Sequence, residues 1–590
     1  MKSMIYFATA LLSGAALCAC NDDDIVGDPA KDWSATTQFV NPVDEPGFST
    51  YYTPAIGTVG DPMPFFDPNS KTFKVLYLQE YASNDPFCFH PIWGIETSDC
   101  ANYRSMGEVL ATGSSSLEQD AALGTGCCYY CASDKLYYIY YTGHNGSLSD
   151  IEVVMRATSS DFKTWKKDAS WSLRGLDFGY SNVDFRDPQI FEEGGKYHMI
   201  IATKPANGGD PCFAEFVSSD MKNWEKGEQV KMIWDRMLEC PDIFQMGKKW
   251  YCIYSESVRT SWSRKVKYMV ADSWDELKKC FNEGPKWPAD DREGVLDSRA
   301  LYAAKTAANG EDRYIWGWSP RRIGGNVWEK NVNVGAGDGN EPAWSGSLVC
   351  HRLVQHEDGT LSVGEVPGME AKYSKTAEVK IMEQGSEHTL YNRLGYHNHI
   401  SFRLQTATDA DRWGVSFVRT SDTKKYYSII CNPEWENGRR KFNFEEEGEE
   451  GKHFIEGADG YIMPRPADNT YQVDIYTDNS VVVIYVNGEW GCTQRIYGIQ
   501  NNCWSINNYG CNITVSDLKV TQYLSKQKNG TSSTTLLAPH SNDKNTLNYE
   551  KNPTLSDGSY DLYLCVCYRC VGGNASCNLG NNTQHRGHQI

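Results

Sequence analysis

Residues 186–201 read RDPQIFEEGGKYHMII, and residues 239–254 read ECPDIFQMGKKWYCIY, so one alternating hydrophobic segment occurs twice. The blocks ATSSDFKTWKK, from residue 157, and FVSSDMKNWEK, from residue 216, repeat in the same way. A self-similar unit of roughly 50 to 60 residues, made of short alternating strands, is typical of a β-propeller blade. Because the first strand of every blade runs along the central axis, residues at the repeat starts are expected to meet in one funnel.

The repeats predict an all-β protein that begins with a five-bladed β-propeller over residues 51–366. Its blades start near Tyr51, Thr125, Arg186, Glu239 and Ser298. Five blades of four strands need on the order of 300 residues, which this span supplies. Segments such as SVVVIYVNGE predict a β-sandwich over residues 374–524. Residues 525–590 are polar or cysteine-rich without a hydrophobic pattern, so we expect a linker and a tail of unknown role.

Composition limits the partners of the chain. The 590 residues carry a net charge of −19, which argues against nucleic acid because phosphates require basic surfaces. The 18 Trp and 35 Tyr suit strand cores and also suit an oligo- or polysaccharide that stacks on aromatic rings. We expect no cofactor, and the sequence does not indicate an oligomeric state.

The 20 cysteines are spaced irregularly, unlike a disulfide framework. Several stand singly inside apolar strand patterns, where a thiol behaves as a small buried hydrophobe: Cys88, Cys212, Cys252, Cys350 and Cys431. We therefore expect mostly free thiols, with a few disulfide bridges as an alternative. The late cluster Cys565, Cys567, Cys570 and Cys577, near His585 and His588, fits no standard zinc spacing, so no metal site is predicted, although zinc there is an alternative.

The N-terminus has the features of an export signal. Lys2 is followed by an apolar run that is too short to span a bilayer. Residues 17–20, Leu-Cys-Ala-Cys, resemble a bacterial lipobox, which implies a signal peptide over residues 1–19, lipidation of Cys20 and a tether over residues 20–50. The resemblance implies an outer-membrane lipoprotein at the cell surface that contacts the membrane only through its lipid. A periplasmic or secreted protein is the alternative.

Three acids occur at starts of predicted blades: Asp61, Asp187 and Glu239. Hydrolysis of a glycosidic bond needs one carboxylic acid to protonate the leaving oxygen and one carboxylate to attack the anomeric carbon or activate water. A third carboxylate can fix the sugar hydroxyls. Single Asp-Pro pairs also cap turns between strands, but three acids at matching repeat positions predict an active site.

In chain order, the motifs FRDPQIF, ECPDIF, LDSRALYAAKT and PAWSGSLVCHRL resemble glycoside hydrolase family 32, the β-fructosidases that include levanases, inulinases and invertases. The resemblance covers roughly residues 50 to 520. It implies a retaining enzyme that forms a fructosyl-enzyme intermediate on fructans or sucrose-type substrates. It also implies that Asp61 is the nucleophile, Asp187 the transition-state stabiliser and Glu239 the acid/base.

The same resemblance implies three substrate-binding residues: Gln79, Trp93 and Arg186. Asp67, in the segment Asp-Pro-Asn-Ser, looks closer to the family's nucleophile box than Asp61 does. The family's nucleophile lies about a dozen residues before the next strand, which fits Asp61, whereas Asp67 falls in the predicted hairpin turn. The box around Asp61 then departs from the family pattern, since Gly60 precedes the acid.

Two alternatives stay open from the sequence. One is an inverting arabinofuranosidase or xylosidase of the related family 43, whose blades also begin with Asp-Pro. The glutamate-cysteine motif and the predicted sandwich favour family 32 over this reading. The other alternative is a surface glycan-binding lipoprotein that kept the propeller and lost turnover, although all three acids are present.

Overall fold

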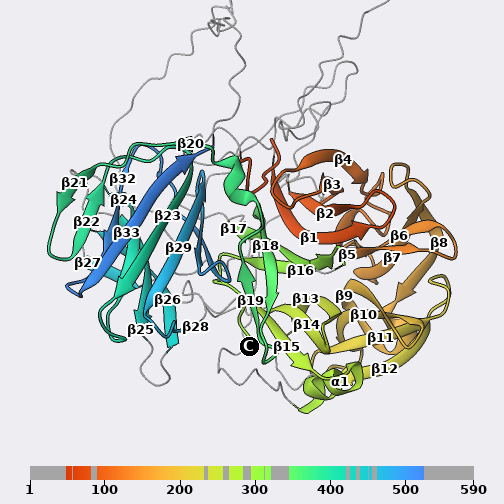
Figure 1. Ribbon diagram of the computed structural model, residues 1–590. Coiled ribbons are helices and arrows are strands. Elements are labelled where there is room, and N and C mark those ends of the chain that lie inside the picture. Colours follow the sequence, from red (N-terminus) through yellow and green to blue (C-terminus); the bar gives the residue numbers. More distant parts are fainter. Residues whose placement is uncertain are drawn as a thin grey trace, which may run out of the picture. The chain divides into compact units, whose positions relative to one another are not determined.

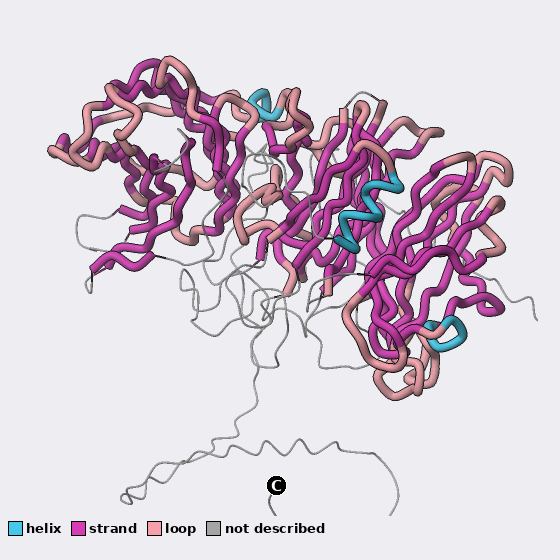
Figure 2. The backbone as a smooth tube through the Cα atoms, turned by 90° about the horizontal axis from the view of Figure 1, so that it is seen from below, coloured by secondary structure: helices cyan, strands magenta, loops and turns pink. Residues whose placement is uncertain are grey.

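The computed structural model describes these residues: 48–55, 57–80, 90–231, 237–256, 265–283, 294–310, 312–320, 344–419, 426–433, 439–448, 451–454 and 462–523. Strands, magenta in Figure 2, make up most of this part of the chain. Within it, no helix is long and apolar enough to cross a membrane. The predicted signal peptide, Cys20, Cys88 and the tail lie outside the described residues.

Five antiparallel blades follow one another along the chain, as the colours from red to green in Figure 1 show. Blade 1 contains β1 (Thr58–Asp67), β2 (Thr72–Glu80), β3 (Ile92–Thr97) and β4 (Arg104–Leu110). Blade 2 contains β5 (Ala122–Cys131), β6 (Leu136–His144), β7 (Glu152–Ser159) and β8 (Lys166–Arg174). Blade 3 contains β9 (Tyr180–Glu193), β10 (Lys196–Pro205), β11 (Cys212–Ser218) and β12 (Glu225–Lys231), and the 3₁₀-helix η2 (Gly175–Phe178) precedes it.

Blade 4 contains β13 (Leu238–Met246), β14 (Lys249–Glu256) and β15 (Val266–Ala271). Blade 5 contains β16 (Tyr302–Ala308), β17 (Arg313–Pro320), β18 (Gly346–Gln355) and β19 (Leu361–Gly364). The first strands of the blades contact one another in a closed ring, from β1 through β5, β9, β13 and β16 back to β1. This ring confirms the predicted propeller and brings the starts of the blades together at one axis.

Blade 4 differs from the prediction of four strands per blade, because its described part has three. The helix α1 (Trp274–Glu283) follows β15 and packs against it. Trp274, Leu277 and Phe281 are buried at helical spacing, and the Ser273 hydroxyl accepts the N–H of Glu276 at the helix start. This single short amphipathic helix has no counterpart in the described parts of the other blades, so the strand repeats did not predict it.

Each first strand of a blade contains a β-bulge at the same place. The pairing with the second strand gains one extra residue between Gly60 and Met63, Gly124 and Gly126, Arg186 and Gln189, Glu239 and Asp242, and Tyr302 and Lys305. In four of the five bulges a residue other than glycine has positive φ: Asp61 (30°), Asp187 (59°), Cys240 (52°) and Ala303 (51°). Such bulges bend a strand and redirect its side chains, and they commonly border active sites.

The sandwich consists of two antiparallel sheets after the 3₁₀-helix η3 (Met369–Lys372). The first sheet runs in the order β20 (Lys375–Thr376), β33 (Ile513–Gln522), β23 (His397–Thr406), β29 (Thr470–Asp478), β30 (Val481–Val486) and β31 (Trp490–Arg495). The second runs in the order β21 (Ile381–Gln384), β22 (His388–Tyr391), β32 (Cys503–Asn507), β24 (Trp413–Arg419), β25 (Tyr426–Pro433), β26 (Arg439–Gly448) and β27 (Gly451–Phe454), and β28 (Ile462–Pro464) pairs with β26. Alternate residues of the strands are buried between the sheets, which confirms the predicted sandwich.

Buried polar residues join the sandwich to the propeller. Arg495 donates to the carbonyls of Ser319 and Pro320 at 2.7 and 3.1 Å, at the end of β17. Asp478 accepts the backbone N–H groups of Thr50 and Tyr51 at 2.6 and 2.9 Å, just before blade 1. Burial would raise the pKa of Asp478, but the interactions with His397 and with these amides outweigh burial and lower it. Asp478 therefore holds Thr50 and Tyr51 as an anion.

The cysteines of the described residues are all free thiols, and most are buried. Cys212, Cys252, Cys350 and Cys431 lie in the hydrophobic core, as their apolar surroundings in the sequence predict.

Candidate active site

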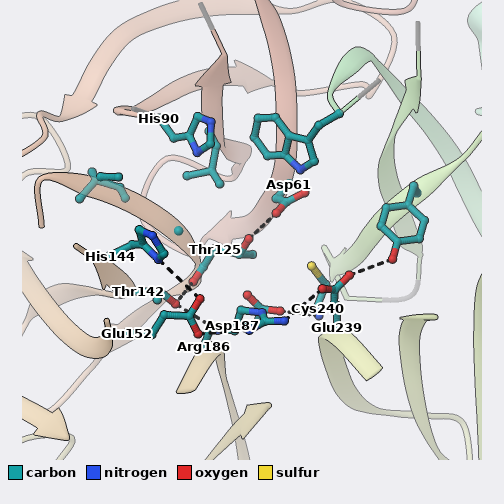
Figure 3. Close-up of a pocket in the computed structure, with 16 residues that line it drawn as sticks. Asp61, His90, Thr125, Thr142, His144, Glu152, Arg186, Asp187, Glu239 and Cys240 are labelled. Atoms are coloured by element: carbon teal, nitrogen blue, oxygen red, sulfur yellow. Dashed lines mark hydrogen bonds and ion pairs between the residues drawn. The ribbon is translucent and has the colours of Figure 1, made fainter. Parts of the chain in front are cut away.

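A pocket of about 330 Å³ lies where the first strands of the blades meet. In Figure 3 the carboxylates of Asp61, Asp187 and Glu239 come from three different strands and border the same space. The other lining residues are Leu78, His90, Ala122, Leu123, Gly124, Thr125, Thr142, His144, Glu152, Arg186, Cys240, Tyr302 and Trp344. The structure therefore brings together the three acids that the repeat positions indicated.

Asp61 is held at both carboxylate oxygens. The Thr125 hydroxyl donates to Oδ2 at 2.6 Å, and the Trp318 indole N–H donates to Oδ1 at 2.9 Å. Burial raises the pKa of Asp61, and these two hydrogen bonds limit the rise because they favour the charged form. The bulge and two fixed donors give this carboxylate one orientation toward the pocket.

Asp187 is the most buried of the three acids, with 4% of its surface exposed. Its Oδ2 accepts the N–H of Cys240 at 2.8 Å, and its own N–H donates to the Thr142 hydroxyl at 3.1 Å. Burial raises the pKa of Asp187 to about 7; the charge of Arg186 opposes this rise and the charge of Glu239 adds to it.

Glu239 lies beside Asp187 and has a donor on each oxygen. The Tyr302 hydroxyl donates to Oε2 at 2.9 Å, and Arg186 Nη2 donates to Oε1 at 3.2 Å. The Tyr302 hydroxyl also has a second acceptor, the carbonyl of Glu256, at 3.1 Å. Glu239 therefore sits in a polar wall of the pocket in which a hydroxyl donor can change partner.

The bulges correct the expectation that the three acids occupy matching repeat positions. Asp61, Asp187 and Cys240 each have positive φ in their bulge and are each followed by proline, so these three positions correspond. Glu239 is one residue earlier and corresponds to Arg186. The side chain of Glu239 consequently leaves its strand from a different point than the two aspartates, and it approaches the pocket from another direction.

Asp67 ends β1 outside the pocket, where it organises the hairpin turn. It accepts hydrogen bonds from the Ser70 hydroxyl at 2.6 Å and the Asn69 N–H at 2.9 Å. Tyr137 donates a third at 2.8 Å. Together these donors outweigh burial and lower the pKa of Asp67. Its contacts are those of a turn cap.

Gln79 and Trp93 are not among the residues that line the pocket. Gln79 is 1% exposed in β2, and Trp93 is 2% exposed within the hydrophobic core of blade 1. Arg186, the third predicted substrate-binding residue, does line the pocket. Neither Gln79 nor Trp93 is therefore assigned a contact with sugar from this geometry.

Several residues that line the pocket were not predicted from the sequence. Thr125 and Tyr302 lie in the bulges of blades 2 and 5, so the blade starts were a signal that could have found them. His90 and Trp344 come from outside the strands, and their rings stack at 4.4 Å. Nothing in the repeat pattern marks these two residues. Trp344 also fills the space beside Gly60, where a Cβ atom would lie 2.2 Å from its ring.

Three carboxylates, a guanidinium and several hydroxyl donors around one cavity can transfer a proton, stabilise a developing positive charge and offer a nucleophile. Within the described residues, no group of three or more His, Cys, Asp or Glu side chains is placed to hold a metal ion.

Family comparisons cover both parts of the chain. Residues 52–362 match the glycosyl hydrolases family 32 N-terminal domain, and residues 359–520 match the domain described as GH32, BT1760-like, C-terminal domain. The first match spans the propeller and the second spans the sandwich. The combination does not favour the family 43 alternative.

Individual relatives agree with this assignment. The chain is 24% identical to the raffinose invertase of Escherichia coli over 404 residues, which is 62% of this chain and 72% of that protein. The fold is similar to that of sucrose-6-phosphate hydrolase from Lactobacillus gasseri, with a TM-score of 0.63 and 16% identity over 85% of this chain and 98% of the other. Fructan 1-exohydrolase IIa from Cichorium intybus has a TM-score of 0.61 and 14% identity over 81% of this chain and 97% of the other. The chain thus belongs to glycoside hydrolase family 32 and is a glycosidase that acts on β-fructofuranosidic bonds.

Proposed function

We propose that this glycosidase works with retention of configuration, with Asp61 as nucleophile, Glu239 as acid/base and Asp187 as stabiliser of the transition state. The observation that carries the proposal is the convergence of these three carboxylates on one pocket. Fructans and sucrose-type saccharides are the proposed substrates, since the relatives named above are an invertase, a sucrose-6-phosphate hydrolase and a fructan exohydrolase.

In the first step Asp61 attacks the anomeric carbon of the fructosyl unit, while Glu239 gives its proton to the leaving oxygen. Two donors hold Asp61, so little reorganisation is needed when its oxygen forms the bond to the anomeric carbon and the bond to the leaving oxygen breaks. In the second step Glu239 removes a proton from water, which then releases fructose from Asp61. Asp187, beside Glu239, accepts hydrogen bonds from fructosyl hydroxyls in this proposal.

The test uses two variants and two kinds of substrate. Asp61→Asn should lose several orders of magnitude in rate on every fructoside, because no nucleophile remains. Glu239→Gln should lose about 10² to 10⁴ on sucrose, levan and inulin, yet keep the first step for a nitrophenyl fructoside whose leaving group needs no proton. Added azide should then speed turnover of Glu239→Gln and yield a β-fructosyl azide. An α-configured azide product would refute the retaining mechanism, and an active Asp61→Asn enzyme would refute Asp61 as the nucleophile.

We also propose that the enzyme is exported as an outer-membrane lipoprotein, which is lipidated at Cys20 and exposed at the cell surface. The support is the lipobox-like sequence before Cys20. Labelling cells with palmitate should tag the wild-type protein, and Cys20→Ala should lose both the label and the membrane association. Cys18→Ala is the matched control and should keep both. Continued labelling of Cys20→Ala would refute this anchor.

A further inference from the structure

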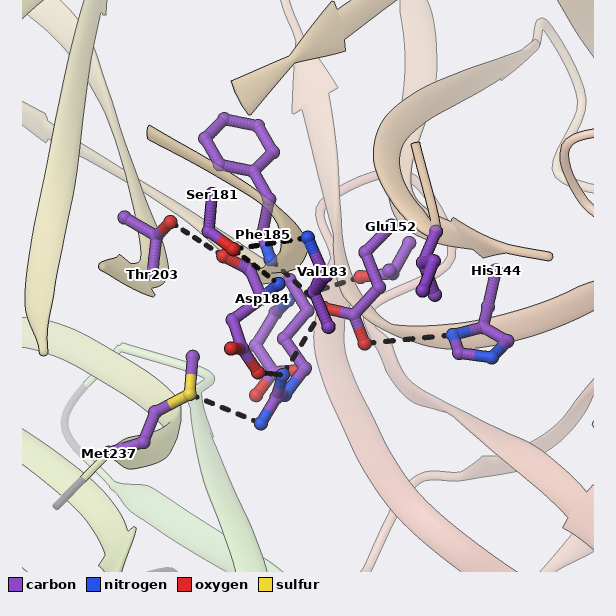
Figure 4. A network of polar contacts seen from close by, with 12 residues as sticks. His144, Glu152, Ser181, Val183, Asp184, Phe185, Thr203 and Met237 are labelled. Carbon is purple, nitrogen blue, oxygen red and sulfur yellow. Dashed lines mark hydrogen bonds and ion pairs between the residues drawn. The ribbon is translucent and has the colours of Figure 1, made fainter. Parts of the chain in front are cut away.

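Glu152, at the start of β7 in blade 2, is a pocket residue without a role in the mechanism above. Its carboxylate is largely buried, and its side chain faces blade 3. Oε2 accepts the Phe185 N–H at 2.9 Å and Arg186 Nη1 at 3.2 Å. Figure 4 shows Glu152 between His144 and the β9 segment from Ser181 to Phe185, and Oε1 lies 3.6 Å from the His144 ring.

Arg186 is held at both ends of its guanidinium group, and Met237 Sδ also accepts Nη2 at 3.1 Å. Nη1 contacts Glu152 and also donates to Asp184 at 2.9 Å, while Nη2 donates to Glu239. Because the guanidinium is a rigid planar fork, holding Nη1 determines where Nη2 points. Glu152 and Asp184, which both accept Nη1, therefore fix together how Arg186 meets the acid/base.

Asp184 shares this task through Oδ1, but its charge is divided, because its Oδ2 pairs with Lys204 at 2.6 Å. The backbone of Asp184 is held by contacts that do not involve Glu152. The Ser181 hydroxyl accepts the Asp184 N–H at 3.1 Å, and the Thr203 hydroxyl donates to the Asp184 carbonyl at 2.6 Å. The negative charge of Asp184 is thus shared between two cations. Glu152 supplies a second negative charge next to Arg186.

We propose that Glu152 is a positioning residue for proton transfer by Glu239. It holds Arg186 on Oε1 of Glu239 and offsets part of the guanidinium charge, which would otherwise oppose protonation of Glu239. Oε2 is then free to carry the proton, since the Tyr302 hydroxyl can turn to the Glu256 carbonyl. The inference rests on the proposed acid/base role of Glu239.

Other titratable or charged groups also face the Glu239 carboxylate. They are Arg186 and Asp187 on β9, Asp61 on β1, Tyr302 on β16 and the adjacent Cys240. Neutralising Glu152 changes none of them chemically. It leaves an unbalanced positive charge on Arg186, so Glu239 should lose its proton at lower pH.

The test is Glu152→Gln, whose amide oxygen can still accept the Phe185 N–H. For sucrose, kcat/KM should fall about 10- to 100-fold at pH 7, and the high-pH limb of its profile should move about one unit lower. For a nitrophenyl fructoside, whose leaving group needs no proton, formation of the fructosyl-enzyme should change less than about threefold. Glu152→Asp, which keeps the charge, should recover part of the lost activity on sucrose.

Glu215→Gln is the matched control. Glu215 is also a buried glutamate that accepts a backbone N–H and faces a histidine, His198, but it does not line the pocket. Its neutralisation should leave the pH profile unmoved. Equal losses of Glu152→Gln on both substrates with an unmoved profile would show a purely structural role and overturn the proposal, as would an unchanged enzyme. If the wild-type enzyme released fructose from neither substrate, the proposed function itself would fail instead.

Discussion

Replacing Asp187 by asparagine should make the protein more stable above neutral pH and abolish its activity. Burial raises the pKa of this carboxyl to about 7, compared with an ordinary value of 3.8, although the charge of Arg186 opposes the rise. Asparagine has nearly the same shape and keeps an oxygen for the N–H of Cys240, but it carries no charge. The substitution therefore removes the cost of ionising a buried acid and retains its main hydrogen bond.

The sign and size of this change in stability follow from proton linkage. Between pH 3.8 and about 7 the folded protein holds the proton of Asp187 more tightly than the unfolded chain does, so the free energy of unfolding falls as pH rises. The full cost is reached above about pH 7. At about 1.4 kcal/mol for each pKa unit, it amounts to at most about 4 kcal/mol.

Calorimetry at two pH values measures this effect. With an unfolding entropy of about 2.1 cal/mol/K per residue and about 310 residues in the propeller, 1 kcal/mol moves the Tm by about 1.5 °C. Asp187→Asn should thus melt up to about 6 °C above wild type at pH 8 and within about 1 °C of it at pH 4.

Asp67→Asn provides a control of opposite sign. Hydrogen bonds outweigh burial and lower the pKa of Asp67, so its ionised form stabilises the fold above the ordinary pKa and this contribution is lost as pH falls. Asp67→Asn should accordingly melt below wild type at pH 8. The reasoning is refuted if Asp187→Asn melts no higher than wild type at pH 8, or gains equally at pH 4 and pH 8.

Three further predictions concern two neighbours of Asp61 in the pocket region and Asp67 in the adjacent hairpin turn. Gly60→Ala should lower activity at least tenfold and reduce Tm, because its Cβ would lie 2.2 Å from the Trp344 ring. The double variant Gly60→Ala with Trp344→Ala should recover stability, and the Tm of both variants checks this. Thr125→Val removes the donor to Asp61 Oδ2 and should raise the pKa of Asp61 further, so the low-pH limb of kcat/KM should move up by about one to two units in a pH series. Asp67→Asn should keep kcat/KM on sucrose within about twofold, since Asp67 caps a turn outside the pocket. If this variant were inactive, Asp67 rather than Asp61 would be the nucleophile.

The repeats were sufficient to predict the propeller, because strand alternation and the recurrent Asp-Pro and Cys-Pro segments reflect local backbone requirements. They also indicated that Asp61, Asp187 and Glu239 would meet, since blade starts converge whatever the loops do. The one-residue offset of Glu239 can be read from the sequence, since Cys240-Pro241 aligns with Asp187-Pro188, but its effect on the side chain depends on how each bulge pairs with the neighbouring strand. Trp344 and Glu152 could not be found either, as their places depend on contacts between blades.

The link between Asp478 and the N–H of Thr50 has a consequence for the order in which the protein matures. These partners are 428 residues apart in the chain. During synthesis these two amides just before blade 1 have only water as a partner until β29 of the sandwich has been made. Such a distant pairing favours slow, late closure of the molecule, and any interruption of translation before Asp478 leaves the beginning of the enzyme without its partner.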